Sequence, residues 1–96
     1  MKSIITAEIE IVALGTESTS MSSHISDAVK AIEKLGIKYQ LTPMGTVIEV
    51  SSIDEVFSAT IAVHEEVIKK GIKRVITHIT IDDRRDVPIE SIKSKI

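Results

Sequence analysis

This 96-residue chain contains no cysteine, so thiol chemistry is excluded. The side chains considered first for catalysis or binding are its carboxylates, hydroxyls and histidines. Three of the carboxylates, Glu8, Glu10 and Glu49, fall in segments that alternate apolar and polar residues. If these segments are neighbouring strands, the three carboxylates crowd together on one face of a sheet, where they can share a proton or bind a cation. A solvated sheet face is the plainer interpretation, and it stays open, most of all for Glu8.

Hydroxyl groups gather between residues 16 and 23, in the run TESTSMSS. Ser20 or Ser22 can cap the first N–H groups of a following helix. Other hydroxyls of the run, with Thr16, can donate hydrogen bonds to a small ligand at that helix end. The run contains no nucleophile elbow, and Gly15 alone is not a glycine-rich phosphate loop. It therefore indicates helix capping or ligand contact.

The histidines do not indicate a metal site. His24, His64 and His78 include no pair with the i, i+4 spacing of a helical metal site. A zinc site also needs three or four ligands that converge on one point. We expect no metal ligand here and interpret His64 as a packed or interface residue.

Two arginines near the C-terminus, Arg84 and Arg85, are flanked by Asp82, Asp83 and Asp86. Surface ion pairs, each of small energy, explain such a cluster. A role in an interface is equally open, since arginine favours buried bidentate pairs with carboxylates.

Four strands and two helices must position these groups. Alternation with a period of two predicts strands at roughly residues 3–13, 37–42, 46–50 and 75–82. Helical spacing predicts one helix between the serine run and Gly36, and a second between Ser52 and Gly71. Ser52 and Glu55 form a capping box at the start of the second helix. Its predicted apolar stripe contains Ile53, Val56, Phe57, Thr60, Ile61, His64, Val67 and Ile68.

The order strand, helix, strand, strand, helix, strand predicts the α+β class. With right-handed crossovers it gives a ferredoxin-like β-α-β-β-α-β sandwich, whose antiparallel four-stranded sheet carries both helices on one face. We expect residues 1–96 to form one such domain, with a short C-terminal helix starting near Pro88. The face without helices is predicted to carry Glu8, Glu10, Gln40, Thr42, Val47, Glu49, His78 and Thr80.

Composition excludes several classes of partner. A net charge of −2 and a content of one Tyr and one Phe argue against nucleic acid, which needs a basic footprint or a stacking platform. No apolar run approaches the roughly 20 residues of a membrane span, and the N-terminus lacks a signal-peptide pattern. We therefore expect a cytoplasmic protein. A chain this short buries only about 60–70% of its unfolded surface, so we also expect it to associate with other copies.

The segments together resemble the small cytosolic thiamine-binding domain family related to YkoF. The resemblance spans nearly the whole chain. Its most specific motif is Thr-Pro-Met-Gly-Thr-x-x-Glu at 42–49, within the hairpin run YQLTPMGTVIE at 39–49. Further marks are LGT at 14–16, SMS at 20–22, HE at 64–65, GIKRV at 71–75 and IDDR at 81–84.

The resemblance implies a homo-oligomer, a dimer or a dimer of dimers, that binds thiamine or its hydroxymethylpyrimidine part without catalysis and without a cofactor. It implies ligand contacts from Leu14, Gly15, Thr16, Ser20, Ser22, Thr42, Met44, Gly45, Thr46 and Glu49. The threonine and serine hydroxyls would serve the edge of the aminopyrimidine, and Glu49 would accept from its amine or balance the thiazolium charge. Storage, delivery or sensing would be the role. An oligomeric regulatory or structural module that binds another metabolite, or none, stays the alternative.

Overall fold

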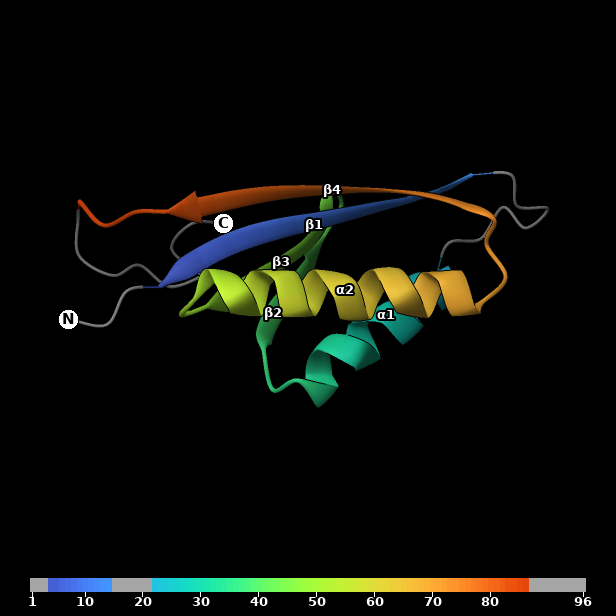
Figure 1. Cartoon of the computed structure of the whole chain (residues 1–96), viewed down its shortest axis with the longest axis horizontal. Helices are drawn as coiled ribbons and strands as arrows, with labels where there is room; N and C mark the ends of the chain where they lie inside the picture. The colour runs from blue at the N-terminus through green and yellow to red at the C-terminus, as the bar shows by residue number, and fades with distance from the viewer. Residues whose placement is uncertain (1–3, 15–21, 87–96) are drawn as a thin grey trace.

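The structure, a computed structural model, describes residues 4–14 and 22–86. Its elements follow the predicted order (Figure 1): strand β1 (Ile5–Leu14), helix α1 (Ser22–Lys34), strand β2 (Lys38–Thr42), strand β3 (Gly45–Val50), helix α2 (Ile53–Lys69) and strand β4 (Arg74–Asp83). The predicted C-terminal helix lies outside the described residues.

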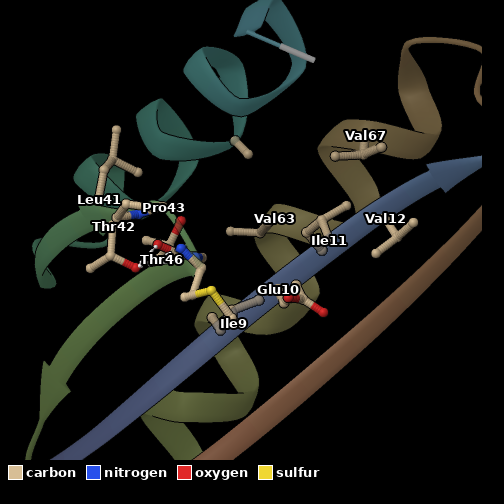
Figure 2. A pocket seen from close by; sticks show the side chains of 13 residues that line it. Ile9, Glu10, Ile11, Val12, Leu41, Thr42, Pro43, Thr46, Val63 and Val67 are labelled. Carbon is tan, nitrogen blue, oxygen red and sulfur yellow. Dashed lines mark hydrogen bonds between the residues drawn. The ribbon is translucent and has the colours of Figure 1, made fainter. Parts of the chain in front are cut away.

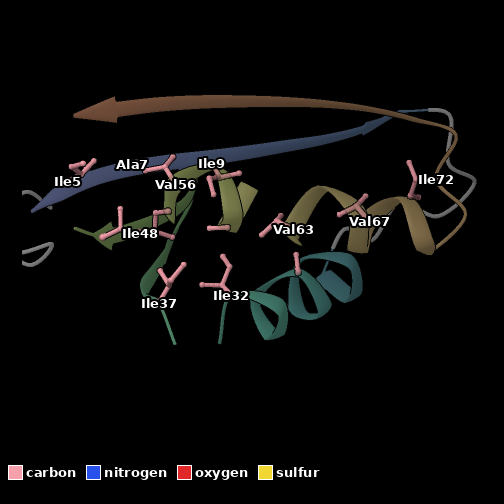
Figure 3. Close-up of a cluster of buried hydrophobic side chains, with 13 residues drawn as sticks. Ile5, Ala7, Ile9, Ile32, Ile37, Ile48, Val56, Val63, Val67 and Ile72 are labelled. Atoms are coloured by element: carbon pink, nitrogen blue, oxygen red, sulfur yellow. The ribbon is translucent and has the colours of Figure 1, made fainter. Parts of the chain in front are cut away.

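All strand pairs of the sheet are antiparallel, in the order β2-β3-β1-β4. This order arises when two strand–helix halves are joined by a hairpin, here β2–β3, and it confirms the predicted ferredoxin-like sandwich. Both helices contribute to one hydrophobic core on the face of β1 that carries Ile5, Ala7 and Ile9 (Figure 3). The largest fully buried side chains are Ile5, Ile9, Ile32, Ile48, Val56 and Val67.

The two neighbours of β1 cover unequal lengths of it. β4 pairs with all 10 residues, from Ile5 opposite Asp83 to Leu14 opposite Arg74. β3 pairs only with residues 5–9, because it begins at Gly45, directly after the hairpin turn. The second half of β1 therefore has no described strand on its β3 side.

The apolar face of α2 differs from the predicted stripe. Phe57, Ile61 and Ile68 are 49%, 62% and 40% exposed, so the prediction was wrong for these three residues. Successive helical residues turn by about 100°, and the three lie one step around the helix from the face that packs on the sheet. The buried residues of α2 are Val56, Ala59, Thr60, Val63 and Val67.

The predicted capping box of α2 is confirmed. Ser52 is the N-cap, and its hydroxyl accepts the N–H of Glu55 at 3.3 Å. The Glu55 carboxylate reaches back one residue further than the simplest box requires, and accepts the N–H of Ser51 at 3.2 Å. The first bond satisfies an N–H group that a helix start leaves without a partner, and the second ties Glu55 to the residue before the N-cap.

Tyr39 links β2 to α1, and this link predicts a pH effect. Its phenol donates a hydrogen bond to the Glu33 carboxylate at 2.5 Å, which raises the pKa of Tyr39, helped by burial and by the negative charge of Glu33. Because the pKa is raised on folding, the stabilisation is present at neutral pH and is lost as the pH rises through the raised value.

Since the chain has one tyrosine and no tryptophan, absorbance of the phenolate reports this titration alone. We expect a titration midpoint above the ordinary value for tyrosine, and a lower midpoint in Glu33→Gln. Identical midpoints in the two proteins would show that the hydrogen bond does not act on the phenol.

Candidate ligand-binding site

A cavity of about 400 Å³ lies where the β2–β3 hairpin ends and β1 continues without it (Figure 2). Pockets that bind small molecules typically enclose roughly 300–1,000 Å³. Its walls come from β1, the hairpin and both helices, and consist of Ile9, Glu10, Ile11, Val12, Ala28, Leu41, Thr42, Pro43, Met44, Gly45, Thr46, Val63 and Val67.

The cavity meets β1 at its edge rather than on one of its faces. Residues 9–12 line it in an unbroken run, and Figure 2 shows them following one another along the strand opposite the hairpin. Successive strand residues point to opposite faces of a sheet. Four in a row can border one cavity only if that cavity lies beside the strand, in the place that a longer β3 would occupy.

Thr42 lines the cavity, but its hydroxyl serves the hairpin turn. The oxygen accepts the N–H groups of Met44 and Gly45, each at 3.2 Å, and the hydroxyl donates to the Gly45 carbonyl at 3.0 Å. A hydroxyl has one hydrogen and two lone pairs, so these bonds use its full capacity. Thr42 therefore shapes the wall of the cavity, and its hydroxyl has no capacity left for a ligand; a ligand contact by the rest of Thr42 stays a prediction.

Gly45 brings β3 unusually close to β1. A Cβ atom placed on Gly45 would lie 2.8 Å from the carbonyl oxygen of Ile9, a distance that real Cβ atoms essentially never show. Its φ of 156° is also one that other residues rarely adopt. The hairpin can therefore pack against β1 at this point only with glycine.

Met44 and Thr46 give the hairpin side of the cavity its chemical character. Met44 is 66% exposed, so its flexible thioether side chain is available to cover a bound ring. Thr46 is half-buried, and no hydrogen bond engages its hydroxyl among the described residues. The structure thus brings together four residues that the resemblance implied for the site, namely Thr42, Met44, Gly45 and Thr46.

Glu49 does not line this cavity. It lies opposite Thr6 and Lys38 in the sheet, with its carboxylate 3.2 Å from the Lys38 ammonium. The carboxylate that does line the cavity is Glu10, which the sequence placed on the sheet face but not among the ligand contacts. A difference in strand length could have identified Glu10. The first predicted strand, at 3–13, is longer than the third, at 46–50, so part of it must extend beyond the residues that pair with the third. A ligand contact by Glu49 stays a prediction.

The other contacts implied by the resemblance are not tested by the geometry. Leu14 ends β1, is half-buried and does not line the cavity. Gly15, Thr16 and Ser20 lie outside the described residues, and Ser22 begins α1 without a described side chain. A ligand contact by any of these five residues stays a prediction.

The remaining polar groups are engaged in packing or on the surface. His64 Nδ1 lies 2.7 Å from the Thr77 hydroxyl and so joins α2 to β4, as expected for a packed histidine. Arg84 pairs with Asp86 and Arg85 with Asp83, in exposed bidentate contacts of the kind that the surface interpretation predicts.

Within residues 4–14 and 22–86, no three His, Asp or Glu side chains gather to hold a metal ion. No described helix is long and apolar enough to cross a membrane.

The sequence matches a family model described as thiamine-binding protein over residues 7–96. It is 44% identical over 99 residues to a UPF0045 protein of Methanothermobacter thermautotrophicus, covering 97% of this chain and 100% of the relative. It is also 44% identical over 84 residues to the UPF0045 protein YqgV of Bacillus subtilis, covering 83% of this chain and 80% of the relative.

Solved structures share the fold over almost the whole chain. The protein MJ1052 of Methanocaldococcus jannascii superposes with a TM-score of 0.82 at 30% identity, covering 99% of this chain and 93% of that one. A Thermotoga maritima protein, named for a suggested role in thiamine biosynthesis or salvage, superposes with a TM-score of 0.77 at 22% identity, covering 97% and 95%. At 22% identity the second likeness concerns the fold alone.

Proposed function

This chain belongs to the thiamine-binding protein family, and we propose that it binds thiamine or its hydroxymethylpyrimidine part in the cavity beside the hairpin. One observation carries the proposal. The segment Thr42–Thr46, which holds most of the family's most specific motif, forms one wall of a cavity of about 400 Å³. Apolar walls with few polar anchors are typical of small-molecule sites.

The chemistry of the walls suits this ligand. Thiamine joins a flat aminopyrimidine to a positively charged thiazolium ring. Ile11, Val63 and Met44 offer apolar surface to the flat rings, and the Thr46 hydroxyl offers a hydrogen bond to a polar edge. The Glu10 carboxylate supplies the negative charge that a cation or an exocyclic amine prefers.

Binding without catalysis is the role that this lining favours. Among the described lining residues, the polar side chains are one carboxylate, Glu10, and two threonines, Thr42 and Thr46. General acid–base catalysis commonly uses a second titratable group within reach, and the described lining offers none. Storage, delivery or sensing of the ligand is the role that we propose for such a site. Assembly into dimers or dimers of dimers stays part of the proposal, supported by the exposed apolar side chains of α2.

A thermal shift tests the proposed ligand directly. A ligand present at 100 times its dissociation constant stabilises the folded state by roughly 2.7 kcal/mol, which raises the melting temperature of a domain this size by roughly ten degrees or more. We expect this shift with thiamine or hydroxymethylpyrimidine, and a smaller one in Thr46→Val, which keeps the shape of the side chain. The absence of any shift with thiamine, hydroxymethylpyrimidine and thiamine phosphates at millimolar concentration would favour the alternative, a module that binds another metabolite or none.

A further inference from the structure

The backbone of β1 has an edge beside the cavity with which no described strand pairs. The ladder with β3 ends where Ile9 lies opposite Thr46, whereas the ladder with β4 continues to Leu14. Along a strand, the N–H and C=O of one residue point to the same side, and those of the next residue point to the other side. Beyond Ile9, every second residue therefore turns its backbone groups towards the β3 side, where no described strand meets them.

The position of Ile9 identifies which residues these are. Its carbonyl oxygen approaches Gly45 so closely that it would lie 2.8 Å from a Cβ there, so Ile9 points towards β3. By alternation, Glu10 and Val12 point towards β4, and Ile11 points to the side on which β3 has not yet begun. Ile11 also lines the cavity. Its N–H and C=O thus border the cavity, where no described strand offers them the partners that backbone groups take within a sheet.

We propose that the N–H and C=O of Ile11 bind the edge of the ligand's pyrimidine ring, in the way that they would bind a residue of a paired strand. The inference rests on the proposed function and adds the groups that select the ligand. The 4-aminopyrimidine of thiamine carries an N–H donor beside a ring-nitrogen acceptor. That pair complements the acceptor and donor that one strand residue presents side by side. The ring would fill the place that a longer β3 would take.

This arrangement selects for the amino group. Oxythiamine carries a carbonyl in place of the amine and a hydrogen on the neighbouring ring nitrogen, so its donor and acceptor are exchanged. In the same orientation it would set carbonyl against carbonyl and N–H against N–H at Ile11. We expect oxythiamine to bind about tenfold more weakly than thiamine or worse, since a lost hydrogen bond to a buried group costs on the order of one tenfold step in affinity.

Amide hydrogen exchange in the unmodified protein tests the inference without any substitution. We expect saturating thiamine to shift the NMR signal of the Ile11 amide and to slow its exchange by about tenfold or more, because the amide gains a partner. The Glu10 and Val12 amides, which point to β4, are the control and are expected to change much less. If thiamine binds and the Ile11 amide does not respond, the inference is overturned and the proposed function stands.

Proline substitution supplies a second test. Ile11→Pro removes the donor at an edge position that tolerates proline, whereas Ile11→Ala keeps the donor and shortens the side chain. Ala13→Pro places proline on the same edge of the strand, outside the residues that line the cavity. We expect Ile11→Pro to bind thiamine about tenfold more weakly than Ile11→Ala, and Ala13→Pro to bind like the unmodified protein.

The outcomes separate the two proposals. Equal affinities of Ile11→Pro and Ile11→Ala for thiamine would overturn the inference. Failure of the unmodified protein to bind thiamine or hydroxymethylpyrimidine would overturn the proposed function, and the inference with it. The exchange measurement decides the question even where Ile11→Pro does not fold.

Discussion

Replacing Gly45 with alanine is expected to lower the free energy of unfolding by about 2–4 kcal/mol, a large loss for the addition of one carbon atom. The new Cβ would lie 2.8 Å from the carbonyl oxygen of Ile9. A flexible side chain could swing away from such a contact, but a backbone oxygen can move only if β1 or the hairpin moves. The φ of 156° adds backbone strain, since residues other than glycine rarely adopt it.

Urea denaturation of Gly45→Ala beside Gly71→Ala measures this effect. Gly71, with φ of 88°, also has a conformation that favours glycine, but nothing lies within 4 Å of a Cβ placed there. Gly71→Ala therefore reports the cost of the backbone conformation alone, about 1–2 kcal/mol. We expect a clearly lower midpoint for Gly45→Ala than for Gly71→Ala. Equal midpoints would mean that the hairpin adjusts freely, and the walls of the cavity would then be less fixed than the close contact indicates.

The sequence predicts the architecture well because its signals are local. Alternation depends on residues two apart, and a capping box depends on residues three apart. Ser52 with Glu55 correctly starts α2, and the Pro43–Gly45 turn correctly joins β2 to β3. Once the order of elements is known, few topologies remain for two strand–helix halves, and the ferredoxin-like sheet order follows.

The features that the sequence misses depend on contacts between distant segments. The exposed side of α2 can be told from its buried side only when the sheet is in place, because Phe57 and Ile61 are as apolar as the residues that do pack. The role of Thr42 likewise depends on the turn, which engages its hydroxyl fully. A family motif shows that a residue such as Thr42 belongs to the site. It does not show whether that residue contacts a ligand or only shapes the wall of the cavity.

The cavity itself follows from the unequal lengths of β1 and β3. Alternation predicts each strand separately, but it does not state where two strands stop pairing. That point, Ile9 opposite Thr46, decides that the next residues of β1 border a cavity instead of a neighbouring strand. It also decides which carboxylate lines the cavity. Glu10 lies one residue past the end of pairing, whereas Glu49 lies within the paired region, beside Lys38.

Glu10→Gln is therefore expected to weaken thiamine binding by about 10- to 100-fold. A hydrogen bond or ion pair that involves a charged group contributes roughly 1.5–3 kcal/mol, and glutamine keeps the size of the side chain while removing its charge. Hydroxymethylpyrimidine, which lacks the thiazolium charge, is expected to lose less affinity if the carboxylate faces that ring. Calorimetric titration of both ligands into Glu10→Gln measures the two losses.

Glu49→Gln is the matched control, because it makes the same change of one carboxylate to an amide on the same face of the sheet. Its side chain is outside the lining of the cavity, and its carboxylate pairs with Lys38. We expect its affinity for thiamine to stay within about twofold of the unmodified protein. A larger loss in Glu49→Gln than in Glu10→Gln would instead assign the ligand to the sheet face without helices, where the alternation of the third strand places Glu49. Binding would then use a carboxylate whose charge Lys38 already balances, and thiamine would have to displace that lysine to reach it.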